Sequence, residues 1–167
     1  MTEKAIHAQC ALLIIDMQQG FDNPYWGKRN NPDLEDNVSA LVDAWRAHAL
    51  PLIHVQHSST NPQSPLRPGQ LGHDFKKEAR PLTGEKQFQK NVNSGFIGTQ
   101  LESYLREENI EQLVIVGLTT DHCVSTTTRM SGNLGFDVFL VADACATFDR
   151  SDFHGVHKSA DEIHQVH

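Results

Sequence analysis

The sequence has no excess of positive charge, and this excludes one large class of partners. Its 14 lysines and arginines are outnumbered by 21 aspartates and glutamates, which gives a formal net charge of −7. A nucleic-acid-binding surface needs cationic side chains to replace counterions along the phosphate backbone. We therefore expect no nucleic-acid partner for this chain.

Long apolar runs are also lacking. The longest strongly apolar run covers residues 10–15, whereas about 20 such residues are needed to cross a bilayer. The charged-then-apolar pattern of a secretion signal does not precede this run. We expect a cytoplasmic protein that does not bind membranes.

Cysteine is scarce, and its spacing argues against two kinds of structural site. The chain has three cysteines, an odd number, and no two of them form a C-x-x-C pair. A disulfide framework and a structural zinc site are therefore not expected. The G-x-G-x-x-G motif is also lacking after every predicted strand, which argues against a dinucleotide-binding oxidoreductase. We expect no cofactor.

Alternating strands and helices indicate a single α/β domain. A chain of 167 residues can bury one core but is short for two ordinary domains. Its initial strand–helix–strand order favours a parallel crossover. Apolar runs predict strands at 11–15, 51–55, 113–116 and 138–141, and helical periodicity with capping signals predicts helices at 31–49, 99–109, 122–134 and from 159 onwards.

The stretch DHCVSTTTR, from Asp121 to Arg129, allows two interpretations. Its His-Cys-x5-Arg spacing is that of a cysteine phosphatase loop. Such a loop normally needs glycines at positions of positive φ, and residues 124–128 contain none. The alternative is a helix that begins at His122 or Cys123, where the dipole favours an anion and predicts a lowered pKa for the Cys123 thiol.

A cysteine by itself does not make a catalytic site, because many cysteines pack as small apolar residues. We expect that structural role for Cys10 and Cys145. Cys123 differs because Asp16, which ends the first predicted strand, should reach the same edge of a parallel sheet. Asp16 could then accept the thiol proton, and Lys90 could keep the carboxylate ionised. Strand-end aspartates that tie down turns and solvated lysines are the structural alternatives.

Three separated motifs resemble those of the isochorismatase-like cysteine hydrolase superfamily. They are ALLIIDMQQGF at 11–21, KNVNSGF at 90–96 and VGLTTDHCV at 116–124. The similarity extends from about residue 8 to the end of the chain. It implies a three-layer Rossmann-like fold, with a mainly parallel sheet flanked by helices on both faces.

The resemblance also implies which residues act. It assigns a catalytic triad to Asp16, Lys90 and Cys123, and a cis peptide bond between Leu118 and Thr119. The backbone N–H groups of Thr119 and Cys123 would form an oxyanion hole for a tetrahedral intermediate. Relatives are commonly dimers or larger, so the resemblance implies a homodimer or higher homo-oligomer here as well. Relatives also continue past the position of His167. The single domain at 1–167 is therefore expected to lack the end of its last helix and a final strand.

The presence of Cys123 favours the amidase branch of this superfamily. The true isochorismatases, which hydrolyse a vinyl ether, lack the nucleophilic cysteine, whereas nicotinamidases and carbamoylsarcosine hydrolases have it. We expect hydrolysis of a small amide or carbamoyl substrate through a thioester intermediate. The alternatives are vinyl ether hydrolysis and a non-catalytic binding or scaffold protein with a hydrolase-like fold.

A catalytic metal is not expected, and neither is nicotinamide as the substrate. Nicotinamidases carry an Asp-x-His pair and further histidines after the second strand, whereas this chain has His54 and His57. Three residues apart on a strand, these two side chains point to opposite faces. The histidines near the end of the chain are expected to be solvated: His154, His157, His164 and His167.

A long loop and several aromatic residues are expected to shape the pocket. Prolines and glycines interrupt residues 56–90, and a loop of this length usually forms part of a binding site. We expect residues 58–88 to act as a lid that limits substrate size. The candidate pocket residues are Phe21, Trp26, His57 and Phe96.

Overall fold

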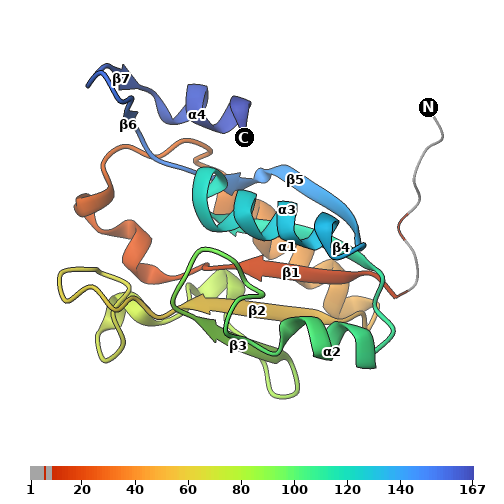
Figure 1. Ribbon diagram of the computed structural model, residues 1–167. Coiled ribbons are helices and arrows are strands. Elements are labelled where there is room, and N and C mark those ends of the chain that lie inside the picture. Colours follow the sequence, from red (N-terminus) through yellow and green to blue (C-terminus); the bar gives the residue numbers. More distant parts are fainter. Residues whose placement is uncertain (1–5, 7–8) are drawn as a thin grey trace.

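The central element of the fold is a five-stranded parallel sheet. The computed structural model describes residue 6 and residues 9–167. The strands are arranged in the order β3-β2-β1-β4-β5, and each neighbouring pair is parallel (Figure 1). Their bounds are β1 Ala11–Ile15, β2 Leu52–His57, β3 Lys86–Lys90, β4 Gln112–Leu118 and β5 Asp137–Ala146.

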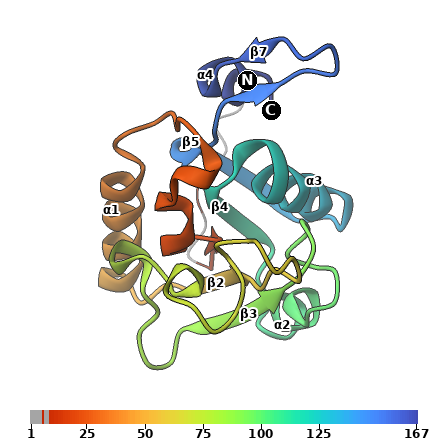
Figure 2. The same ribbon diagram turned by 90° about the vertical axis from the view of Figure 1, so that its left-hand side faces the viewer.

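Helices cover both faces of the sheet, as predicted. In Figure 2, α1 (Leu34–Ala47) lies on the left of the strands, and α2 (Leu101–Glu107) and α3 (Ser125–Asn133) lie on the right. All five residues of β1 are fully buried, and they alternate between the two layers. Burying a leucine or isoleucine side chain contributes about 1.5–3 kcal/mol, so the run that begins at residue 11 fixes the centre of a three-layer α/β fold.

The start of α1 differs from the prediction. The helix predicted at 31–49 begins only at Leu34. Asn31 has a φ of +44°, and its side-chain amide donates hydrogen bonds to the carbonyls of Ala142 and Cys145. Asn31 therefore fastens the connection before α1 to the distant strand β5.

The predicted loop at 56–90 ends in a strand that the sequence pattern does not reveal. Lys86–Lys90 forms β3 at the edge of the sheet, where most of its residues are at least partly exposed. An edge strand of this kind can be polar, so it lacks the apolar run that predicts β1 and β4. Its register places Lys90 beside His57.

The remainder of the loop folds back onto the carboxyl ends of β1 and β2. The fully buried side chain of Gln18 donates to the carbonyls of His57 and His73 at 3.0 and 2.9 Å, and accepts from the His57 amide at 2.8 Å. Gly20 permits the close approach, because a Cβ atom there would lie 2.7 Å from the Gly72 carbonyl oxygen. These contacts hold the loop over one edge of the sheet.

The chain ends in an arm beyond the carboxyl end of β5 (Figure 1). It consists of the antiparallel strands β6 (Arg150–Ser151) and β7 (His157–Lys158) and the helix α4 (Ala160–Val166). The side chains of Ser159 and Glu162 form a capping box at the start of α4, which begins where the sequence predicts a helix. His164 is not simply solvated, because Nδ1 of its ring lies 2.8 Å from the Thr120 hydroxyl. Among the described residues, no helix combines the length and apolar character needed to span a membrane.

Candidate active site

The carboxyl ends of β1 and β4 lie unusually close together. Gly117 is paired with Ile15, and its φ of +123° belongs to a conformation that favours glycine. A Cβ atom at Gly117 would lie only 2.0 Å from the Ile15 carbonyl oxygen. Directly after Ile15, Asp16 has a φ of +51°, so the chain turns sharply at the end of the strand. The turn that follows β4 is thereby placed above Asp16.

The structure brings Asp16, Lys90 and Cys123 together in one buried cluster. The Lys90 ammonium nitrogen lies 2.6 Å from Oδ2 of Asp16 and 3.2 Å from the Cys123 sulfur. It also lies 3.1 Å from Nδ1 of His57. The side chains of Asp16 and Lys90 are fully buried, and Cys123 is 8% exposed. We call Asp16, Lys90 and Cys123 the Asp–Lys–Cys cluster.

Opposite charges keep Lys90 cationic despite its burial. Burial lowers the pKa of Lys90, but the Asp16 carboxylate and the Cys123 sulfur outweigh this effect, so the pKa lies above its ordinary value. The cluster thus contains a buried ion pair whose ammonium also contacts the sulfur. The Lys90 ammonium therefore stays protonated around neutral pH.

The prediction of a lowered thiol pKa for Cys123 is wrong. Burial raises the pKa of this thiol and the nearby Asp16 carboxylate raises it further, while Lys90 acts in the opposite direction without cancelling them. The helix start on which the prediction depended is present, but a thiolate must also lose its hydration in this buried place. The resting site therefore holds a protonated sulfur beside a carboxylate.

This protonation state can be measured by alkylation. The pKa of Cys123 lies above its ordinary value, so the rate with iodoacetamide should be low at pH 7 and still rise beyond pH 9. The chain unfolded in urea is the control, with a midpoint near the model-peptide value of about 8.5. Peptide mass spectrometry separates Cys123 from the other thiols. A rate that levels off below pH 8 in the folded protein would contradict this assignment.

The helix that carries Cys123 begins earlier than predicted, with one π-helical turn. This turn covers Thr120–Val124, and α3 continues from it. The peptide bond between Leu118 and Thr119 is cis, as the sequence resemblance implied. The amides of His122 and Val124 both donate to the Thr119 carbonyl, at 3.1 and 3.2 Å. Cys123 is therefore held within the first turn of a continuous helix.

The phosphatase interpretation does not fit this geometry. Arg129 lies in α3, and its Nε donates to the hydroxyl of Ser125, one turn earlier, at 3.2 Å. A phosphatase loop would direct this arginine to a phosphate bound at the cysteine. Here the segment between the two residues is helical, so Arg129 does not share a ligand with Cys123.

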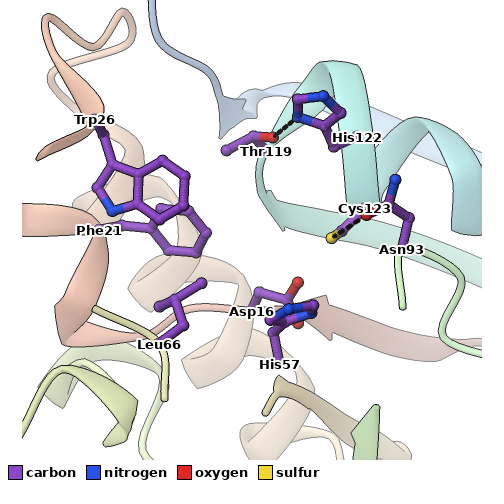
Figure 3. Close-up of a pocket in the computed structure, with 9 residues that line it drawn as sticks. All are labelled: Asp16, Phe21, Trp26, His57, Leu66, Asn93, Thr119, His122 and Cys123. Carbon is purple, nitrogen blue, oxygen red and sulfur yellow. Dashed lines mark hydrogen bonds between the residues drawn. The ribbon is translucent and has the colours of Figure 1, made fainter. Parts of the chain in front are cut away.

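A cavity of about 280 Å³ lies directly above the cluster. Figure 3 shows an apolar wall of Phe21, Trp26 and Leu66 facing Cys123 and Asn93 across the space. Polar side chains occupy the remaining sides. The residues that line the cavity are Asp16, Phe21, Trp26, His57, Leu66, Asn93, Thr119, His122 and Cys123.

Three of the four predicted pocket residues line this cavity, and Phe96 does not. Phe96 is 7% exposed and stacks on Phe136, with 6.1 Å between the ring centroids, in the core beneath α2 and α3. Asn93, Leu66 and His122 line the cavity but were not among the predicted pocket residues.

The sequence around Asn93, His122 and Leu66 differs in how clearly it indicates that each residue lines the cavity. Asn93 lies three residues after Lys90 in the same motif, and its Oδ1 is 3.8 Å from the Cys123 sulfur. His122 directly precedes Cys123. These two positions could have been found from the motifs, whereas nothing in the local pattern around Leu66 indicates that it reaches the cavity.

The residues present do not fit a resident metal ion. Within residue 6 and residues 9–167, one group of potential ligands is found: atoms of Asp16, His57 and Cys123 lie within 4.8 Å of one another. The Lys90 ammonium contacts all three of these side chains and takes the place of a cation among them. His54 is directed elsewhere, with Nε2 at 2.8 Å from Glu85. A histidine cluster like that expected in nicotinamidases is not formed among these residues.

A Rossmann-like α/β fold with a buried thiol, carboxylate and ammonium beneath an open cavity is the architecture of an enzyme. Residues 10–161 match the isochorismatase domain, and the chain belongs to the isochorismatase family. Members of this family are hydrolases, and the protein is an isochorismatase-family hydrolase.

Similar proteins cover most of the chain. An isochorismatase-family crystal structure from Chromobacterium violaceum has a TM-score of 0.93 and 50% identity, covering 96% of this chain and 83% of that chain. The isochorismatase family protein YrdC of Bacillus subtilis is 46% identical over 93% of this chain and 83% of its own length. Nicotinamidase 3 of Arabidopsis thaliana is 30% identical over 83% of this chain and 74% of its own length.

Proposed function

We propose that the protein hydrolyses a small amide or carbamoyl compound, with Cys123 as the nucleophile. The observation that carries this proposal is the buried ammonium of Lys90, which contacts both the Asp16 carboxylate and the Cys123 sulfur. A nucleophile and a base held together at the base of a cavity are the requirements for covalent acyl transfer.

Asp16 is suited to move the proton. The Cys123 thiol is protonated at rest, so attack needs a base within reach. An Asp16 carboxylate oxygen and the Cys123 sulfur lie within 4.8 Å of each other. Oδ1 of Asp16 is buried and makes no hydrogen bond to any residue that the structure describes. This oxygen can therefore accept the thiol proton while Oδ2 stays paired with Lys90.

The reaction then follows in two steps. In the first, the sulfur bonds to the carbonyl carbon, and the oxygen takes up negative charge beside the backbone amides of Thr119 and Cys123. Asp16 returns its proton to the leaving nitrogen, the C–N bond breaks and a thioester remains. In the second step Asp16 accepts a proton from water, whose oxygen attacks the thioester. The acid is released and the sulfur is protonated again.

The cavity restricts the size and character of the substrate. Pockets for drug-sized ligands are commonly 300–1,000 Å³, and this one is about 280 Å³. Phe21, Trp26 and Leu66 would contact a flat or apolar part of the substrate, while the scissile group faces Cys123. The similarity to Nicotinamidase 3 supports cleavage of an amide.

A screen of small primary amides and ureides tests the proposed function. Release of ammonia is measured in solution, and mass spectrometry of the intact protein detects an added acyl group. We expect at least one compound to release ammonia and to leave an acyl group on Cys123. Turnover that persists without this residue would reject the mechanism. A chain that turns over none of the compounds but binds a stoichiometric protein partner would favour the scaffold alternative.

A further inference from the structure

The contacts of Lys90 determine the tautomer of His57. A lysine ammonium has three N–H donors and no acceptor. Lys90 has three partners at hydrogen-bond distance: Oδ2 of Asp16, the sulfur of Cys123 and Nδ1 of His57. Nδ1 of His57 must therefore accept a hydrogen bond. In a neutral imidazole the other nitrogen, Nε2, then carries the hydrogen.

His57 is neutral in this environment. Burial lowers the pKa of the ring, and the positive charge of Lys90 lowers it further, against a smaller opposing effect of Asp16. A ring nitrogen that faces an ammonium at 3.1 Å cannot readily take up a proton of its own. His57 thus presents one N–H group and one lone pair, and the lone pair is already used by Lys90.

The backbone of His57 is fixed, so the direction of its ring is fixed as well. The Gln18 side chain bonds both the amide and the carbonyl of His57. The residue is also paired in the sheet with Lys90. With Nδ1 held by the ammonium, the ring has little freedom to rotate. Nε2 is consequently a preorganised donor.

Nε2 of His57 has no partner within the described part of the chain. Its ring makes one hydrogen bond there, through Nδ1. Nε2 is not fully buried, and His57 lines the cavity. In Figure 3 its ring lies beside Asp16 on one side of the cavity. The N–H group is therefore accessible from the space above Cys123.

The apolar wall cannot replace this donor. Nε1 of Trp26 already donates to the Gly20 carbonyl at 2.8 Å. Phe21 and Leu66 have no polar side-chain atoms. An oxygen of the substrate that turned toward this wall would lose its hydrogen bonds to water without compensation. Polar groups of the substrate therefore have to face the polar side of the cavity, to which His57 belongs together with Asn93, Thr119 and His122.

We propose that the Nε2–H group of His57 binds a second acceptor oxygen of the substrate and makes His57 a specificity-determining residue. The preferred compounds then carry a keto or carboxylate oxygen within reach of the scissile carbonyl, whose own oxygen faces the Thr119 and Cys123 amides. The inference rests on the proposed function for the orientation of the substrate. The tautomer of His57 does not depend on it.

Two substitutions separate the roles of the two ring nitrogens. In His57→Asn, an oxygen near the position of Nδ1 can still accept from Lys90, but the side chain is too short to replace Nε2–H. In His57→Gln, an amide N–H group can reach the position of Nε2. Asparagine thus removes the proposed donor and keeps the contact with Lys90, and glutamine keeps a donor.

Binding is measured with two matched amides on a Cys123→Ala background, so that absent turnover cannot affect the result. Butyramide and acetoacetamide have the same chain length, and only acetoacetamide has a second carbonyl oxygen. One hydrogen bond is worth about 0.5–1.5 kcal/mol. We expect acetoacetamide to bind about 3- to 10-fold more tightly. His57→Asn should remove this preference, and His57→Gln should retain most of it.

Equal binding of the two amides to the Cys123→Ala chain would overturn the proposal. An unchanged preference for acetoacetamide after the further substitution His57→Asn would overturn it as well. The tautomer is tested separately by NMR of the ¹⁵N-labelled wild-type chain, in which the His57 signals are those that His57→Asn lacks. We expect hydrogen on Nε2 and none on Nδ1. Hydrogen on Nδ1 would also overturn the proposal. If the amides are bound with this preference but never hydrolysed, the proposed function fails and the specificity assignment stands.

Discussion

Replacing Cys123 with alanine should lower kcat for the substrate by at least about 10⁴-fold, because removing an activated nucleophile leaves only binding and oxyanion stabilisation. The Cys123 side chain is small and lies at the base of the cavity, so the fold should be retained. Ammonia release gives kcat, and thermal unfolding of the same sample checks the fold.

Cys145→Ala is the matched control. Cys145 is fully buried at the end of β5, where burial raises the pKa of its thiol to about 12, and it does not line the cavity. Its replacement should cost on the order of 1 kcal/mol of stability and leave kcat within about 3-fold of the parent value, less than 1 kcal/mol in activation free energy. Equal activity of the Cys123→Ala variant and the parent would end the case for a thioester.

Among the single substitutions proposed for this chain, Lys90→Met should lower the free energy of unfolding the most. The substitution removes the ammonium and leaves the fully buried Asp16 carboxylate without its ion-pair partner. Breaking one side of a buried pair typically costs about 3–5 kcal/mol. The free energy of unfolding, measured by urea denaturation at neutral pH, should fall by that amount, and activity should be lost with it.

A second substitution distinguishes an unpaired charge from a simple packing defect. In Lys90→Met combined with Asp16→Asn, no carboxylate remains in the Asp–Lys–Cys cluster, so part of the lost stability should return. Lys77→Met is the control for replacing a lysine, because the Lys77 side chain is 86% exposed. It should change the stability by less than about 0.5 kcal/mol. A double variant less stable than Lys90→Met would contradict the buried ion pair as the cause.

The strands at the centre of the sheet could be predicted because burial on both faces makes them continuous apolar runs in the sequence. β1 is covered on both faces, so each of its residues is apolar, and the run ends at Asp16. β4 is fully buried in the same way. β3 is an edge strand in contact with solvent, and its polar residues give no comparable signal.

The pocket was harder to predict than the Asp–Lys–Cys cluster. The three cluster residues lie in motifs whose resemblance to a known family places them at one sheet edge. Leu66 reaches the cavity only because the loop folds back over Gly20. Phe96, which lies in one of the motifs, packs instead against Phe136 in the core. Which aromatic side chain faces a cavity depends on the path of the backbone after the strand, and sequence spacing does not define that path.

The amino-acid sequence by itself determined the α/β class, the central strands and the position of Asp16 at a strand end, since apolar runs are local properties of the chain. The resemblance of its motifs to a known family added Lys90 and Cys123. Tertiary structure alone decided the state of the thiol and the orientation of His57. Asp16 and Lys90 are 74 residues apart in the sequence yet form a buried pair. The pKa of a thiol beside them depends on lost hydration and on nearby charges, and both arise only when distant segments pack together.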